Sequence, residues 1–127
     1  MSPDLQQKLF EDFPEFFRDK NLTIYQSCMP WGIEVGDGWY QIIYDMCTKI
    51  KQLNPPESFR FSQVKEKFGF LRIYCIGDDE EIYKVIMEAE NASDKTCEDC
   101  GSTEDVWQAG SWIRTLCQNC WDKREDI

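Results

Sequence analysis

Apolar and polar residues follow a clear helical period in residues 37–54. Apolar side chains recur there at steps of four, three, four and three residues, which places them on one face of an α-helix. Asp37 or Gly38 is predicted to begin this helix, and Pro55 ends it because the residue before a proline avoids the helical conformation. The face predicted to be buried in the core consists of Trp39, Ile43, Met46, Ile50 and Leu53.

Two segments rich in aromatic and β-branched residues follow this helix. Residues 59–65 and 70–76 have the strand pattern, and residues 66–69 join them, with Gly69 supplying the turn. The pattern predicts an antiparallel β-hairpin with the long helix packed on one face. Because side chains of a strand alternate between its two faces, one face of the second strand is expected to contain Leu71, Ile73 and Cys75.

Helical signals also occur at the N-terminus and after the hairpin. A serine and a proline at residues 2–3 are typical of a helix start, and Pro14 is expected to interrupt that helix. Residues 77–79 predict the cap of a further helix that ends near Asp94. Its expected buried edge contains Ile82, Val85, Ile86 and Ala89.

Four of the seven cysteines form two Cys-x-x-Cys pairs near the end of the chain, separated by sixteen residues. This spacing is typical of a structural zinc site, because each pair reaches one ion across a tight turn and the intervening span returns as a hairpin. Such an all-sulfur shell is closed to water and substrate. Two disulfides are the alternative, and they require an oxidising compartment. The predicted zinc ligands are Cys97, Cys100, Cys117 and Cys120.

These patterns together predict an α+β fold. An antiparallel β-hairpin or small sheet packed by helices is expected in residues 1–94. Residues 95–127 are expected to form a structural zinc module packed on that body, in the order of a zinc ribbon or treble clef. Its expected elements are a short hairpin of residues 106–107 and 112–116, turned at Gly110, and a final helical segment over 121–127. About 30 residues bury too little apolar surface to fold alone, so the metal must stabilise this module.

Composition narrows the function. The chain has no histidine, which removes the commonest general base and most open catalytic zinc sites, so we expect a protein that is not an enzyme. We find neither a signal-peptide pattern nor an apolar stretch of membrane-spanning length, and therefore expect a cytoplasmic protein without a membrane segment. The net charge of −10 disfavours binding to nucleic acid.

The charge is distributed unevenly. Residues 60–75 contain four basic residues and one acid. Residues 21–38, before the long helix, are predicted to form an irregular, glycine-rich loop that could present side chains. If this loop folds over the hairpin, aromatic and cationic side chains converge on one pocket. The alternatives are a loop packed over the core, with Asp37 capping the helix, and an exposed strand face paired with acidic neighbours. The candidate ligand-binding residues are Trp31, Glu34, Asp37, Trp39, Tyr40, Lys65, Lys67 and Arg72.

Four sequence motifs, within about residues 30 to 120, resemble a family of small, uncharacterised proteins common in phages and prophages. The motifs are the Trp31–Tyr40, Gln63–Tyr74, Ala89–Gly101 and Gly110–Cys117 segments, in that order. The resemblance implies a phage or prophage setting and, for a phage protein, the cytoplasm of the host cell. Members of that family often have a histidine where this chain has Cys120, which also fits a tetrahedral zinc site. The resemblance implies no catalytic residue.

Three functions remain open from the sequence. The first is sequestration of a nucleotide-like anionic small molecule, which would counter a host defence. The second is an acidic adaptor that mimics nucleic acid and blocks a host protein. The third is nucleic-acid binding through the zinc module, which is disfavoured because residues 97–127 contain seven acids and three bases. The sequence leaves the oligomeric state undetermined.

Overall fold

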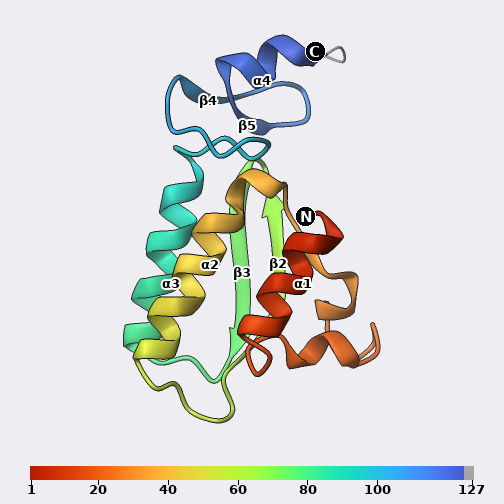
Figure 1. Cartoon of the computed structure of the whole chain (residues 1–127), viewed down its shortest axis with the longest axis vertical. Helices are drawn as coiled ribbons and strands as arrows, with labels where there is room; N and C mark the ends of the chain where they lie inside the picture. The colour runs from red at the N-terminus through yellow and green to blue at the C-terminus, as the bar shows by residue number, and fades with distance from the viewer. Residues whose placement is uncertain (125–127) are drawn as a thin grey trace.

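We analysed a computed structural model, which describes residues 1–124. In these residues the fold is α+β, as predicted: a three-stranded sheet covered on one face by helices, followed by a small C-terminal module (Figure 1). The helices are α1 (Pro3–Asp12), α2 (Tyr40–Gln52), α3 (Glu80–Ser93) and α4 (Gln118–Lys123), with short 3-10 turns η1 (Arg18–Asn21), η2 (Met29–Trp31) and η3 (Asp37–Trp39). The strands are β1 (Ile33–Glu34), β2 (Arg60–Lys67), β3 (Phe70–Ile76), β4 (Val106–Ala109) and β5 (Arg114–Cys117).

Strands β2 and β3 form the predicted antiparallel hairpin. The turn consists of only two residues, Phe68 and Gly69, both with positive φ (54° and 87°). Two successive residues with positive φ form a turn whose twist matches the right-handed twist of the two strands that it joins. Glu66 and Lys67 therefore belong to β2, and the predicted four-residue connection was too long.

Strand β1 was not predicted. Residues 21–38 were expected to be irregular throughout, yet Ile33 and Glu34 pair in parallel with Val64 and Lys65 of β2. Ile33 is buried in the core and Glu34 points to solvent. Two residues are too short a run for an alternating pattern to be recognised in the sequence.

Helices α2 and α3 pack side by side and cover the same face of the sheet (Figure 1). The predicted stripe on α2 is buried, except that Leu53 lies after the helix and is exposed. Asp79 caps α3 as predicted, because its carboxylate accepts the Ile82 N–H at 2.9 Å. Asp37 does not cap α2: its carboxylate accepts the Ser2 N–H at 2.7 Å instead.

The N-terminal segment closes the core beside these helices. Helix α1 ends at Asp12 and Phe13 is its C-cap, directly before Pro14, so the predicted interruption is confirmed. Phe13, Phe16 and Phe17 are buried with Leu9 of α1 against the sheet. The ring of Phe16 packs edge-on against that of Phe59, at 5.2 Å between centroids. These contacts attach α1 to the hairpin.

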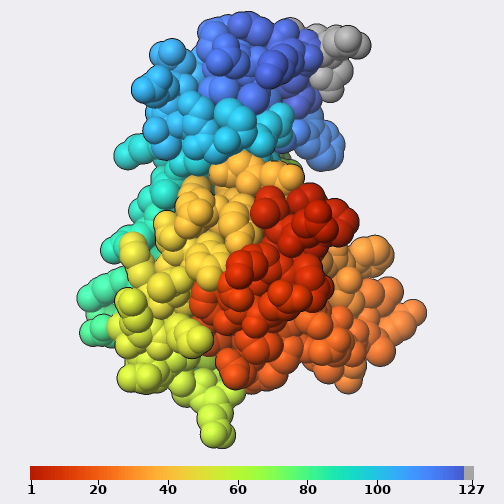
Figure 2. All heavy atoms as spheres, in the orientation of Figure 1, coloured from red at the N-terminus to blue at the C-terminus, as the bar shows by residue number. Residues whose placement is uncertain are grey.

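The C-terminal module forms a lobe at the end of the sheet that contains the β2–β3 turn (Figures 1 and 2). Its buried side chains form their own cluster, separate from the main core: Cys97, Leu116, Cys117, Cys120 and Trp121. The expected strand over residues 112–116 begins only at Arg114, and α4 begins three residues before Trp121. The last part of the predicted final segment, residues 125–127, lies outside the described residues.

Within residues 1–124, no helix has the length and apolar character that crossing a lipid bilayer requires.

Candidate functional site

The four cysteines of the two Cys-x-x-Cys pairs converge in the module. Their sulfur atoms all lie within 4.8 Å of one another, and Cys100 Sγ lies 3.6 Å from Cys117 Sγ. In a tetrahedral site with metal–sulfur bonds of about 2.3 Å, neighbouring sulfurs are about 3.8 Å apart. A disulfide would require about 2.05 Å, and all seven cysteines are free. The residues present therefore form a four-cysteine site suitable for one metal ion.

The backbone conformation around each Cys-x-x-Cys pair brings the two sulfur atoms of that pair together. In the first pair, the Gly101 N–H donates to the Cys97 carbonyl at 2.9 Å, and Gly101 has a φ of 84°, which glycine adopts without strain. In the second pair, Cys117 precedes α4 and Cys120 lies in its first turn. Hydrogen bonds, first from the Cys120 backbone N–H and then from the neighbouring thiols, lower the pKa of the Cys117 thiol to about 7, whereas the pKa of the Cys120 thiol is raised, chiefly by burial. Loop, hairpin and helix follow the order of a treble clef.

Glu98, inside the first pair, anchors the module to the body. Its side chain is only 3% exposed. One carboxylate oxygen accepts the Gly36 N–H at 2.9 Å and the other accepts Arg114 Nε at 3.0 Å, while the Glu98 backbone carbonyl accepts the Gly38 N–H at 2.7 Å. Burial raises the pKa of the Glu98 carboxyl, although the Gly36 N–H and Arg114 act in the opposite direction.

The glycines of the 31–40 loop allow this close approach. A Cβ atom on Gly38 would lie 2.1 Å from the Cys97 carbonyl oxygen, and one on Gly36 would lie 2.4 Å from that of Glu98. Trp39 is fully buried, and its indole N–H donates to the Thr96 carbonyl at 2.8 Å. This part of the loop therefore packs against the first cysteine pair, and Trp39 has no face available for a ligand.

The structure distributes the remaining candidate ligand-binding residues among three places. Glu34, Lys65 and Arg72 are register neighbours across β1, β2 and β3. Asp37 and Tyr40 lie beside α1 instead, where Asp37 binds Ser2 and the ring of Tyr40 lies 5.8 Å from that of Tyr44. The side chain of Trp31 is 64% exposed at the end of η2. The loop thus does not bring Trp39 and Tyr40 to the cations of the hairpin.

One face of the sheet points away from the helices, and we call it the outward sheet face. Val64, Leu71 and Ile73 point into the core, so the alternate positions of β2 and β3 point outward. Tyr74 is 45% exposed there. The face consists of Glu34, Gln63, Lys65, Lys67, Phe70, Arg72 and Tyr74.

The cations of the outward sheet face form no ion pair with an acid in the described part of the chain. Among the ion pairs of residues 1–124, none involves Lys65, Lys67 or Arg72. Arg60 behaves differently, because its guanidinium lies 3.0 Å from the buried carboxylate of Asp19. The interpretation that acidic neighbours neutralise this basic segment therefore holds only for Arg60.

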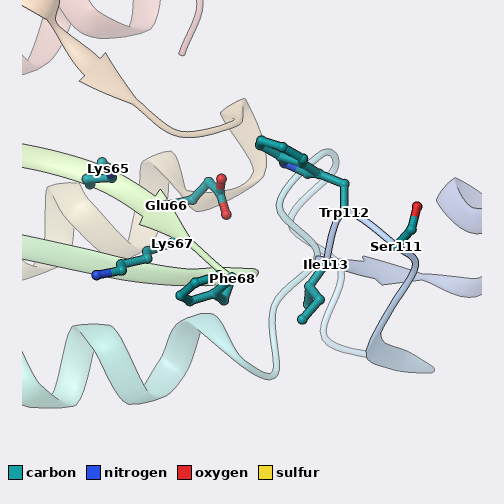
Figure 3. Close-up of a pocket in the computed structure, with 7 residues that line it drawn as sticks. All are labelled: Lys65, Glu66, Lys67, Phe68, Ser111, Trp112 and Ile113. Carbon is teal, nitrogen blue, oxygen red and sulfur yellow. The ribbon is translucent and has the colours of Figure 1, made fainter.

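A groove opens where the β2–β3 turn meets the module, and we call it the hairpin-tip groove (Figure 3). It has a volume of about 320 Å³ and is lined by Lys65, Glu66, Lys67, Phe68, Ser111, Trp112 and Ile113. Only its two lysines were candidates from the sequence. Phe68 was interpreted as part of the turn, and Trp112 and Ile113 as part of a strand. The sequence signal that could have indicated the groove is that Phe68 and Trp112 are large apolar residues close to predicted turns.

Comparisons with protein families, with curated proteins and with solved structures find no match to this chain. The resemblance to phage and prophage proteins therefore remains a prediction from the motifs, and the function has to be argued from the site.

Proposed function

We propose that this chain is a zinc-containing protein that acts by binding and not by catalysis, and that its outward sheet face takes a nucleotide-like anionic small molecule. The observation that carries the proposal is a like-charged pair in the sheet. Lys65 and Arg72 are directly opposite each other on antiparallel strands, and neither has an ion-pair partner in residues 1–124.

This pair is unfavourable without a ligand. Side chains directly opposite each other on antiparallel strands have Cβ atoms about 5 Å apart, so like charges there repel and destabilise the sheet. The chain contains 24 acidic residues, and one of them, Glu34, is the register neighbour of Lys65 without forming an ion pair with it. A phosphate or carboxylate between the two cations would remove the repulsion and form charge-assisted hydrogen bonds.

The chemistry of the four-cysteine site supports zinc with a structural role. Thiolates select zinc or iron–sulfur chemistry, and four of them around one Zn²⁺ form a closed tetrahedral shell without a position for water. The site also lies at the junction with the body, where Glu98 holds Gly36 and Gly38. In this proposal the metal maintains the fold and does not touch the ligand.

The biological role follows from the resemblance alone. In a phage or prophage, a protein that sequesters a nucleotide signal would counter a host defence that depends on that signal. The rival proposal, an acidic adaptor that blocks a host protein, is favoured by the net charge of −10. The two differ in whether the cations of the outward sheet face are needed.

Two alanine variants test the proposal. Native mass spectrometry of the purified protein, without chelator, reports the number of zinc ions and any co-purified small molecule. Lys65→Ala and Arg72→Ala are each expected to weaken binding of that molecule, or of added adenosine triphosphate, by about tenfold or more, because each removes a charged hydrogen bond. Lys84→Ala is the matched control, since Lys84 is an exposed lysine on α3 whose ion pair with Glu80 spans 3.8 Å.

Unchanged binding in both folded variants would contradict the proposal. Capture of a host protein that weakens with salt and persists in both variants would favour the adaptor instead. A shift of nucleic acid in a gel at low salt would favour the nucleic-acid alternative.

A further inference from the structure

The hairpin-tip groove exposes two large aromatic side chains to solvent. Trp112 is 76% exposed and Phe68 is 67% exposed, and both line the groove. Figure 3 shows Phe68 on the hairpin side of the groove and Trp112 and Ile113 on the module side. The volume of about 320 Å³ lies at the lower end of the range for small-molecule sites, about 300–1,000 Å³.

Phe68 is in a backbone conformation that suits other residues better. Its φ is 54°, in the left-handed region, where asparagine, aspartate and glycine are the usual hairpin-turn residues. A bulky residue there is strained, and burial does not compensate for the strain because most of the ring is exposed. Strained backbone conformations of this kind cluster at functional sites. If this position served only the turn, a residue without the strain would fit it better.

The two sides of the groove are held in place by hydrogen bonds. The hydroxyl of Thr115, which is fully buried, donates to the Gly69 carbonyl and so attaches the turn to the module. The Gly69 N–H donates to Glu66 at 3.0 Å, which fixes the one acid of the groove. The turn that carries Phe68 is therefore held against the module.

The groove is charged at one end and apolar at the other. In Figure 3 the amino group of Lys67 points along the hairpin, away from the module, while Trp112 and Ile113 lie at the module end. Lys65 and Lys67 line the groove and also belong to the outward sheet face. A ligand that fits both ends has a planar apolar part joined to an anionic part.

We infer that the hairpin-tip groove is the subsite for the aromatic ring of the ligand, a nucleobase that stacks on Trp112 and Phe68 while its phosphates contact Lys65 and Lys67. This inference rests on the proposed function, because Lys65 contacts the anion in both. It goes further in requiring a ring and in assigning residues of the zinc module to the binding site. An inorganic anion would leave the aromatic end of the groove unused.

The test compares two probes, adenosine triphosphate and inorganic triphosphate, by calorimetric titration of the zinc-loaded protein. The wild-type protein is expected to bind the nucleotide at least tenfold more tightly than the inorganic anion, because base–aromatic stacking contributes an effect of that size. Trp112→Ala is expected to remove this difference and to leave the affinity for inorganic triphosphate unchanged. Tyr25→Ala is the matched control, since Tyr25 is 94% exposed and does not line the groove.

A second variant distinguishes loss of binding from loss of folding. Phe68→Asn suits the left-handed turn and is expected to keep or raise the midpoint of thermal unfolding while weakening nucleotide binding. Equal wild-type affinity for the two probes, or an unchanged nucleotide affinity in both variants, would overturn the aromatic subsite and leave the anion site standing. No binding of either probe at millimolar concentration would overturn the subsite and the proposed function together.

Discussion

Two segments of the chain carry aromatic residues among charges, and the structure treats them in opposite ways. In residues 31–40, Gly36 and Gly38 donate to Glu98 inside the first cysteine pair, and Trp39 donates to the Thr96 carbonyl just before that pair. In the hairpin, Lys65, Lys67 and Arg72 have no ion-pair partner in residues 1–124. Both segments combine aromatic and charged side chains. The difference lies in whether the named groups have interaction partners within the described part of the chain.

This comparison separates structural residues from functional ones. A glycine on which a Cβ atom would clash with a carbonyl oxygen, or a tryptophan whose indole N–H is hydrogen-bonded, is explained by the fold. Opposed cations and a strained, exposed phenylalanine cost stability. Their contacts within the fold offset little of it: Arg72 donates to the neighbouring Leu71 carbonyl at 3.3 Å, and the Lys67 amino group lies 5.9 Å from the centroid of the exposed Phe68 ring. Residues that the fold does not explain are the ones to test for binding.

Removal of the metal is expected to have the largest effect. Binding of Zn²⁺ to four thiolates contributes about 10 kcal/mol or more to folding of small zinc modules, so a chelator should unfold the C-terminal module. The Gly36 and Gly38 N–H groups, which donate to Glu98, should then lose protection from hydrogen exchange, whereas the β2–β3 ladder should keep most of its protection.

Hydrogen exchange with mass spectrometry, before and after chelation, measures both segments in one experiment. Continued protection of residues 36–39 in the metal-free protein would mean that the loop is held without the module. The comparison between the two segments would then be wrong.

A methyl group on Gly38 is expected to have the next largest effect. The Cβ atom of Gly38→Ala would lie 2.1 Å from the Cys97 carbonyl oxygen, so the loop or the cysteine pair must move. Forcing extra atoms into a packed site costs about 1–3 kcal/mol, which chemical denaturation can measure. Asp37→Ala, at the exposed neighbouring residue, is the control and should cost less. Equal stability of Gly38→Ala and the wild type would show that the close approach is not required.

The sequence predicted the features that depend on local pattern. The stripe of α2, the Asp79 cap of α3, the hairpin and the convergence of four cysteines all follow from spacing or from residue type at one position. Each is determined within a short stretch of chain, where side-chain periodicity and capping act.

The rest depends on contacts between distant residues. Glu98 reaches Gly36, 62 residues earlier, and Thr115 reaches Gly69, 46 residues earlier. Sequence patterns do not report such separations, so the glycines of the loop were considered for a binding role and Trp112 for a strand. The hairpin-tip groove exists only because the module meets the turn.

The smallest expected change in stability is that of Arg72→Glu, and it tests most directly whether the hairpin cations serve binding and not the fold. Arg72→Glu would place an acid opposite Lys65, and an opposite-charge pair across two strands stabilises the sheet by about 0.2–1 kcal/mol. We therefore expect this variant to unfold at a slightly higher denaturant concentration while losing its affinity for adenosine triphosphate. A gain in stability with a loss of binding is typical of a residue kept for function.

Arg60→Glu is the matched control for this prediction, because Arg60 lies on the same sheet and its guanidinium is 3.0 Å from the buried Asp19 carboxylate. The same change of charge should destabilise the fold there, since it places two acids together and leaves Asp19 without its partner. Opposite signs of the stability change at the two arginines would confirm that Arg60 serves the fold and Arg72 does not. If both variants lose stability, an interaction within the chain holds Arg72, and the hairpin no longer differs from the loop.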